Sequence, residues 1–263
     1  MSAAGFVLSL SALVSLVPLG LARIDAHRAP WLALAIAIAG PAVLLTHSFA
    51  GGWRTGLATA LWLAILVSMA LFAGVVALRR GAERLAPLLA FYLVVLAAIA
   101  TVWQHAPERP LMGQPPEAWL IAHILVALVA YGLLTLAAMA GLAVFLQERA
   151  LKTKRPTDFT RRLPSIAEGE RLLAELLMAS GAVLAIALIS GSVLSWLTFA
   201  APMKLDHKTV LSFAAFLAIS GLLWVHHRGG ISGRRAARYV LFAYLLLTLA
   251  YPGVKFVSDV ILG

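Results

Sequence analysis

Long apolar runs separated by short polar segments dominate the pattern of the chain. A helix needs about 20 apolar residues to cross a hydrocarbon core about 30 Å thick, and lipid leaves unpaired backbone groups no partner. The pattern therefore predicts an all-α integral membrane protein with eight transmembrane helices. We place these helices at residues 4–22, 31–49, 57–78, 86–104, 118–146, 172–200, 209–227 and 239–260.

Composition agrees with this pattern. Hydrophobic residues make up 62% of the 263 residues and charged residues only 12%, whereas soluble domains average about 45–50% apolar and about 25% charged residues. These values argue against a water-soluble globular protein, a disordered chain and a nucleic-acid-binding module. No segment is left over for a soluble domain, so we expect a single transmembrane domain over 1–263. The chain has no cysteine, which excludes thiol chemistry and disulfides.

The loops between the predicted spans differ in basic charge. Sixteen Lys and Arg residues lie in the first, third, fifth and seventh loops, and four lie in the second, fourth and sixth. Cytoplasmic loops carry an excess of Lys and Arg, so the imbalance places both termini outside. The longest loop, 148–171, is then cytoplasmic. We expect it to be either a short amphipathic helix at the membrane interface or a solvated connector.

Histidines are the main candidates for chemistry inside the membrane, where ionisable groups are costly. His47 lies about 24 Å along an outward-running span, and His123 lies near the start of an inward-running one, so both are near the outer face. His226 lies about 25 Å along an inward-running span, and it and the adjacent His227 are near the cytoplasmic edge. Hence His47 and His123 are able to share one metal, and His226 belongs to a separate position.

The ligand types favour haem over zinc. A structural zinc site normally has four protein ligands, whereas two axial histidines suffice for haem iron. Trp119 is on the same helix face as His123, four residues earlier. Tyr131 continues this face and is suited to stacking or hydrogen bonding. An alternative interpretation is that small residues here only let helices pack closely and that histidines at span ends are interfacial.

Several segments together resemble the cytochrome c assembly superfamily, of the CcsA-type that handles haem, and within it the branch of YpjD-like and HemX-like inner-membrane proteins. The resemblance implies a multi-pass protein of the bacterial inner (plasma) membrane that uses haem b. The matching segments are Trp119-Leu120-Ile121-Ala122-His123, Ala130-Tyr131-Gly132, Arg162-Leu163-Pro164-Ser165, Ile189-Ser190-Gly191, Lys208-Thr209-Val210-Leu211-Ser212 and Trp224-Val225-His226-His227-Arg228.

The resemblance implies roles for the histidines. His123 stands where the family has an external haem-ligating histidine, and His47 stands at a family histidine late in an early span. The His226-His227 pair stands at a histidine on the inner side, with His226 preferred. The family's Trp-rich external loop is reduced to one Trp here, and no histidine follows His227. An axial partner for His123 is therefore His47 or, less favoured, His207.

The resulting hypothesis is a haem-binding inner-membrane protein that holds or relays haem and is not an enzyme. Neither paired carboxylates in the membrane core nor a nucleophile with its base is visible in the sequence. The alternative is a haem-free membrane scaffold or regulatory subunit that binds another membrane protein through the 148–171 loop. The expected partners are haem, the lipid bilayer and another membrane protein, with no nucleic acid. A secondary transporter is less favoured, because no deeply buried acidic residue is evident.

Overall fold

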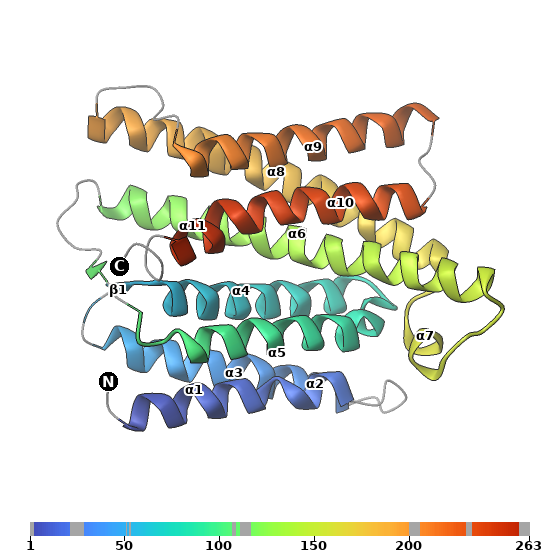
Figure 1. Ribbon diagram of the computed structural model, residues 1–263, viewed down its shortest axis with the longest axis horizontal. Helices are drawn as coiled ribbons and strands as arrows, with labels where there is room; N and C mark the ends of the chain where they lie inside the picture. Colours follow the sequence, from blue (N-terminus) through green and yellow to red (C-terminus); the bar gives the residue numbers. More distant parts are fainter. Residues whose placement is uncertain are drawn as a thin grey trace. The chain divides into compact units, whose positions relative to one another are not determined.

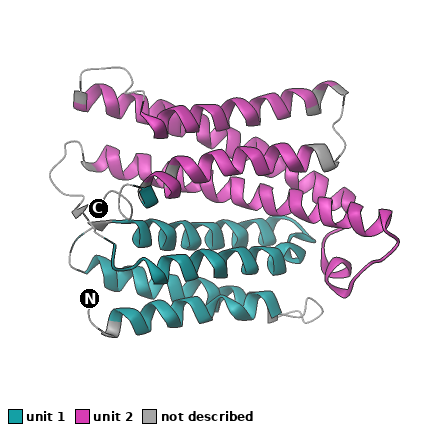
Figure 2. Ribbon diagram, viewed as in Figure 1, with its two compact units in different colours: residues 1–113, 255–263 teal, residues 114–254 magenta. Residues whose placement is uncertain are grey.

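The computed structural model is helical almost throughout (Figure 1). It describes residues 3–21, 29–50, 52, 54–106, 109–110, 117–199, 206–229 and 233–257. The chain divides into two compact units, drawn in two colours in Figure 2. Unit 1 comprises residues 1–113 and 255–263, and unit 2 comprises residues 114–254.

Unit 1 is a bundle of apolar helices. Helix α3 packs against α1 and α4, and α5 packs against α4 and α2. The centre of the bundle is filled by fully buried aliphatic side chains such as Ile65, Leu89 and Leu93. The elements are α1 (Ala3–Ser15), α2 (Val17–Leu21), α3 (Ala29–Phe49), β1 (Arg54–Thr55), α4 (Leu57–Leu78), η1 (Ala82–Leu85), α5 (Ala86–Val102) and β2 (Arg109–Pro110). The two strands form an antiparallel pair of two residues each.

Unit 2 is built around two long helices. Helix α6 packs along both α8 and α10, and α9 packs against α8 and α10. The elements are α6 (Glu117–Lys152), α7 (Asp158–Arg162), α8 (Ile166–Phe199), α9 (His207–Gly229), α10 (Gly233–Thr248) and the π-helix η2 (Leu249–Gly253). A last turn, α11 (Val254–Phe256), follows, and its residues 255 and 256 are assigned to unit 1.

Glycines set the close contact between α6 and α8. A Cβ added to Gly169, near the start of α8, would lie 2.7 Å from Cγ2 of Val144, near the end of α6. A Cβ added to Gly191, near the end of α8, would lie 3.0 Å from Cε1 of His123, near the start of α6. The two helices are therefore antiparallel, and small residues let them approach closely, as is common in membrane bundles.

Among the described residues, six helices are long and apolar enough to cross a membrane: Trp31–Phe49, Leu57–Leu78, Ala82–Val102, Ala118–Lys152, Ile166–Thr198 and His207–Val225. They correspond to the second to seventh predicted spans. The first and eighth predicted spans correspond to shorter apolar helices, Gly5–Leu21 and Ala236–Thr248. The chain is thus an all-helical, multi-pass membrane protein. The count of eight spans and the outward termini stay predictions.

Local interruptions explain the two shorter helices. Regular helix stops between α1 and α2 at Leu16, two residues before Pro18. Proline lacks the backbone N–H that would continue the ladder. At the other end of the chain, α10 ends at Thr248 and passes into a π-helix that contains Pro252. The last predicted span, 239–260, therefore contains less regular α-helix than its hydrophobicity indicates.

The predicted loop 148–171 is shorter in the structure. Helix α6 continues to Lys152 and α8 begins at Ile166, so the connector is residues 153–165. Residues 166–171 belong to α8, and the connector contains the short helix α7, whose position relative to a membrane interface stays a prediction. Ser165 caps α8, because its Oγ accepts from the Glu168 N–H at 3.3 Å and the Glu168 carboxylate accepts from the Ser165 N–H at 3.0 Å.

Candidate functional site

The most specific polar cluster of unit 2 joins the start of α6 to the end of α8. Trp119 and His123 lie on one face of α6, one helical turn apart. Both contact Ser190 of α8: the Trp119 indole Nε1–H donates to the Ser190 carbonyl at 3.0 Å, and His123 Nδ1 lies 2.8 Å from Ser190 Oγ. A single residue of α8 therefore positions both side chains.

Hydrogen bonding indicates the tautomer of His123. Ser190 Oγ donates its proton to the carbonyl of Ala187 at 2.9 Å. A hydroxyl has only one proton to donate, so this contact with Ala187 favours the tautomer in which Nδ1 of His123 carries the ring proton and Ser190 Oγ accepts it. The lone pair of the imidazole is then on Nε2. Metal-binding histidines commonly have this arrangement, in which the other ring nitrogen donates to a nearby acceptor.

Gly191 provides the space beside this imidazole. A Cβ at position 191 would lie 3.0 Å from Cε1 and 3.6 Å from Nε2 of His123. A side chain there would force the ring to move. The sequence Ser190-Gly191 thus combines a hydrogen-bond partner for Nδ1 with a residue that lacks a side chain, so that the His123 ring packs directly against the backbone of α8.

The cluster lies partly at the surface of unit 2. Trp119 is 40% exposed, and His123 and Ser190 are of intermediate exposure. An aromatic ring partly exposed near the end of a membrane helix is typical of the interface between hydrocarbon and headgroups. Among the described residues, no three His, Asp or Glu side chains lie close enough to hold a metal ion by themselves.

Tyr131 lies deeper, about 12 Å along α6 from His123. Its ring is 2% exposed, and its hydroxyl lies 3.0 Å from the hydroxyl of Tyr244 in α10. Thr135 Oγ1 donates to the Tyr131 carbonyl at 2.9 Å and lies 3.4 Å from the Tyr244 hydroxyl. Tyr131 is therefore part of a buried hydroxyl cluster that joins α6 to α10.

The other predicted histidines lie elsewhere. His47 is exposed near the end of α3, in unit 1. His207 is the first residue of α9 and is exposed, at the end of unit 2 where α6 begins (Figure 1). His226 and His227 lie in the last turns of α9, about 28 Å along that helix from His207. Their side chains lie outside the described residues. The structure thus separates His226 from His123 and leaves the His47–His123 pair a prediction.

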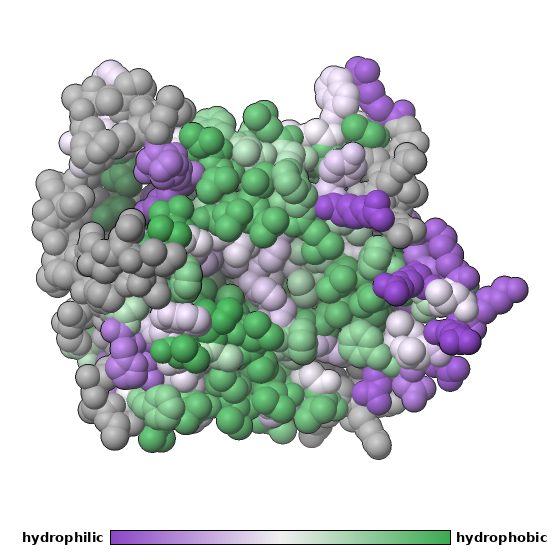
Figure 3. Space-filling view, in the orientation of Figure 1, coloured by the Kyte–Doolittle hydropathy of each residue, from purple (hydrophilic) through white to green (hydrophobic). Residues whose placement is uncertain are grey.

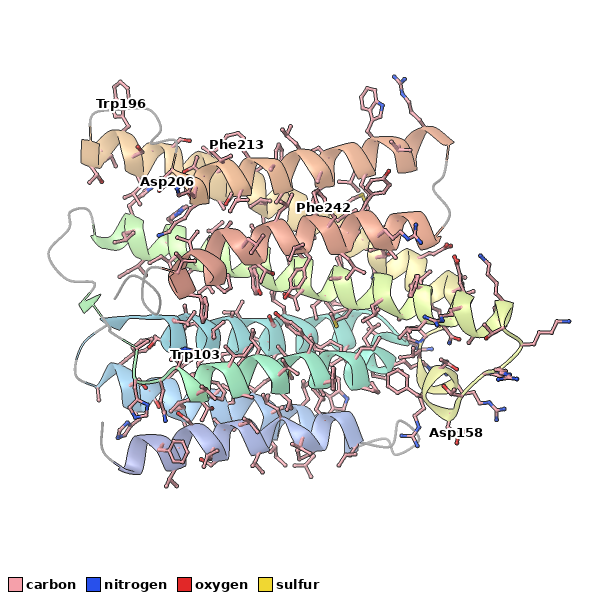
Figure 4. All side chains as sticks on the ribbon, viewed as in Figure 1. Trp103, Asp158, Trp196, Asp206, Phe213 and Phe242 are labelled. Atoms are coloured by element: carbon pink, nitrogen blue, oxygen red, sulfur yellow. The ribbon has the colours of Figure 1, made fainter. Side chains whose placement is uncertain are left out.

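The carboxylate of Asp206 caps the start of α9. Asp206, labelled in Figure 4, accepts from the backbone N–H of Thr209 at 2.9 Å and from its hydroxyl at 2.8 Å. Burial raises the pKa of Asp206. The two hydrogen bonds from Thr209 and the charges of Lys208 and His207 outweigh this effect and hold the pKa below its ordinary value of 3.8. Asp206 is therefore an anion at neutral pH.

Sequence reasoning did not assign three residues that the structure places in these clusters. Ser190 and Gly191 were noted only as part of the family-like segment Ile189-Ser190-Gly191, and neither was given a role. Tyr244 was not singled out, because a lone Tyr in an apolar run has no distinctive pattern. Their contacts join segments more than 60 residues apart, so sequence spacing does not reveal them.

Comparisons with known proteins agree with the motif-level resemblance. The chain is 50% identical over 266 residues to an uncharacterized 28.8 kDa protein of Azospirillum brasilense, and the match covers 98% of each chain. It is 27% identical to the inner membrane protein YpjD of Escherichia coli (strain K12), over 71% of this chain and 69% of YpjD. It is also 27% identical to protein HemX of Brevibacillus brevis, over 51% and 49% of the two chains. No solved structure matches significantly.

Most of the chain also matches a protein-family model. The model for the cytochrome C assembly protein family matches residues 55–262, which include most of unit 1 after α3 and all of unit 2. The Trp119–His123 segment and its Ser190-Gly191 partner both fall within the match. This match and the resemblance to YpjD and HemX show that the chain belongs to the cytochrome c assembly family.

Proposed function

We propose that this protein binds haem at the end of unit 2 formed by the start of α6 and the end of α8, with His123 as an axial ligand. In this proposal it holds or relays haem b in the bacterial inner membrane and catalyses no reaction. The single observation that carries the proposal is the contact of His123 Nδ1 with Ser190 Oγ at 2.8 Å, which favours the tautomer with the imidazole lone pair on Nε2.

The residues around His123 suit a flat, apolar group with a metal centre. Gly191 allows the His123 ring to pack closely on α8, and the partly exposed Trp119 ring offers an apolar surface. Haem iron needs only axial ligands from the protein, since the porphyrin supplies four nitrogens. Trp119 and Tyr131 are both predicted to line the haem. Of the two, Trp119 is the ring exposed next to His123.

The second axial ligand has two candidates. His47 is the histidine that the family resemblance favours, but it belongs to unit 1. His207 belongs to unit 2, is exposed and begins α9 at the end of the unit that holds His123. We further propose that His226 serves a separate haem position on the inner side, since about 28 Å of helix separates it from His207.

The test is an absorption spectrum of the protein purified in mild detergent, with haem quantified as the pyridine haemochrome. We expect a Soret band at near-stoichiometric haem that His123→Ala strongly reduces. His105→Ala is the matched control, because His105 is an exposed histidine just after α5. Loss of the spectrum's bis-histidine character in His47→Ala or in His207→Ala identifies the second ligand.

A colourless protein that stays colourless after haemin is added would overturn the proposal. An unchanged spectrum in His123→Ala would overturn the assignment of His123 as ligand. In the first case the protein is better described as a haem-free membrane scaffold or regulatory subunit, the alternative that the sequence leaves open.

A further inference from the structure

The connector between α6 and α8 carries a cluster of exposed cations. From Leu151 to Arg162 the chain has five basic residues and one acidic residue, Asp158. Hydrophilic side chains gather at this end of unit 2 in Figure 3, and Asp158 marks α7 in Figure 4. We call the exposed residues Leu151, Lys154, Arg155, Phe159, Arg161 and Arg162 the connector surface.

The cations of the connector surface are not neutralised by ion pairs. The ion pairs of this region join Lys152 to Glu148 at 3.9 Å and Arg171 to Glu175 at 3.1 Å. Within residues 117–199, none of the four cations of the connector surface has a carboxylate oxygen within 4.0 Å. Two apolar side chains are exposed among them, Leu151 at 66% and Phe159 at 43%. Exposed apolar groups next to unpaired cations are typical of membrane-interface segments.

The connector is held in a defined shape at both ends. After α6, Lys154 has a φ of 53° and the Arg155 N–H donates to the Ala150 carbonyl at 3.2 Å, as in a Schellman helix end. At α7, the Thr157 hydroxyl accepts from the Thr160 N–H at 3.2 Å, while the Thr160 hydroxyl accepts from the Thr157 N–H at 3.0 Å. The cations are thus presented by an ordered segment.

Gln147 of α6 hydrogen-bonds to the backbone at the end of α7 and just after it. These contacts hold α7 beside the position on α6 where the apolar run ends. Gln147 Nε2 donates to the Thr160 carbonyl at 2.8 Å and lies 3.2 Å and 3.4 Å from the carbonyls of Pro164 and Leu163. Gln147 is the first polar residue after the apolar run, and α6 continues about 7 Å beyond it to Lys152. The connector therefore folds back from the helix end toward the membrane boundary.

We propose that the connector surface binds the headgroups of anionic phospholipids, with Phe159 and Leu151 contacting the adjacent acyl region. Charge complementarity selects this occupant, and the bilayer is always within reach because α6 and α8 both span it. Each Lys or Arg near an anionic membrane surface strengthens binding by about fivefold. This surface is distinct from the His123 cluster, which lies at the opposite end of α6, and its function is independent of haem.

The test is native mass spectrometry of the full-length chain in neutral detergent, titrated with phosphatidylglycerol or phosphatidylcholine. We expect phosphatidylglycerol to bind at least about tenfold more tightly, and the triple variant Arg155→Gln/Arg161→Gln/Arg162→Gln to lose this preference. The matched control is Arg80→Gln/Arg84→Gln/Arg238→Gln, which removes three exposed cations from other segments. It should keep the preference.

Three outcomes would overturn the proposal. Equal binding of the two lipids excludes an anionic lipid site. A preference that the triple variant and the control retain alike places lipid binding elsewhere on the protein. If the triple variant instead loses cross-linking to a protein with an acidic segment in native membranes, the connector surface docks a protein and not lipid. None of these outcomes depends on bound haem, so a failure here is distinguishable from a failure of the proposed function.

Discussion

His123 Nδ1 lies 2.8 Å from Ser190 Oγ, which joins the first turns of α6 to the last turns of α8. The contact links two residues 67 positions apart and sets the direction of the imidazole in the cluster with Trp119. If the proposed function is correct, this contact determines both the position and the basicity of the haem ligand.

Replacing Ser190 with Ala should weaken haem binding by about 10–100-fold, because partners of this kind orient the ligand and raise its basicity. The change should also shift the tautomer equilibrium of His123 in the haem-free protein. Two-dimensional ¹⁵N NMR of histidine-labelled protein reports the tautomer, and titration with haemin reports affinity.

Ser180→Ala is the matched control for that substitution. Ser180 is on the same helix and donates to the carbonyl three residues earlier at 3.0 Å, just as Ser190 does. We expect Ser180→Ala to change neither readout, and Ser190→Thr to restore both. Equal effects of Ser180→Ala and Ser190→Ala would mean that the hydroxyl of Ser190 only stabilises α8.

Gly191→Ala should displace the imidazole of His123, since the new Cβ would lie 3.0 Å from Cε1. We expect loss of most of the Soret absorbance with the protein still folded. Gly221→Ala in α9 is the control, because a Cβ there would meet nothing within 4 Å. That substitution should leave haem unchanged and stabilise the helix by up to about 1 kcal/mol. If Gly191→Ala retained its haem, the close contact between Gly191 and the His123 imidazole would not be required for haem binding.

Tyr244→Phe should destabilise unit 2. The contact between the Tyr131 and Tyr244 hydroxyls at 3.0 Å would be lost, and the net contribution of such a hydrogen bond is about 0.5–1.5 kcal/mol. Thermal unfolding in detergent measures the loss. Tyr239→Phe, on the exposed side of α10, is the control and should be neutral. A double substitution with Tyr131→Phe should cost less than the sum of the single ones, because it removes both members of the pair.

Acid should loosen the start of α9. The pKa of Asp206 is lowered in the folded protein, so its capping contribution is complete above the ordinary value of 3.8 and is lost as pH falls through the lower folded value. Hydrogen exchange at the Thr209 amide, corrected for intrinsic pH dependence, should show lower protection below about pH 4 and constant protection from pH 5 to 7. Asp206→Asn should abolish this dependence, and an unchanged profile in that variant would show that another group titrates.

Gln147→Leu should free the α6–α8 connector. The carbonyls of Thr160, Leu163 and Pro164 would lose their common donor. Limited trypsin digestion after Lys154, Arg161 and Arg162 should then be several-fold faster than in the unaltered protein. Glu148→Gln is the control, because its contact with Lys152 at 3.9 Å is a partly exposed ion pair of small energetic value. Equal digestion rates in the two variants would mean that the end caps alone hold the connector.

The membrane class, the helical fold and six of the spans were predictable from the sequence, because hydrophobicity acts locally and lipid leaves the backbone few alternatives. The family was predictable for a similar reason, since its motifs are short contiguous segments such as Trp119–His123. The ends of helices were less predictable. The stop at Leu16 and the π-helix containing Pro252 depend on backbone hydrogen bonds that an apolar run does not reveal.

The contacts of the candidate site required the tertiary structure. The sequence identified His123 and Trp119 by their spacing on one helix face, but gave no role to Ser190, which contacts both. It also predicted that Tyr131 stacks on a cofactor or forms a hydrogen bond, and only the fold shows that this residue is buried with its hydroxyl 3.0 Å from that of Tyr244. The physical reason is the same in both cases. Hydropathy and helical period determine which residues share a face of one helix, and only the antiparallel packing of α6 on α8 and α10 decides which residues meet across two.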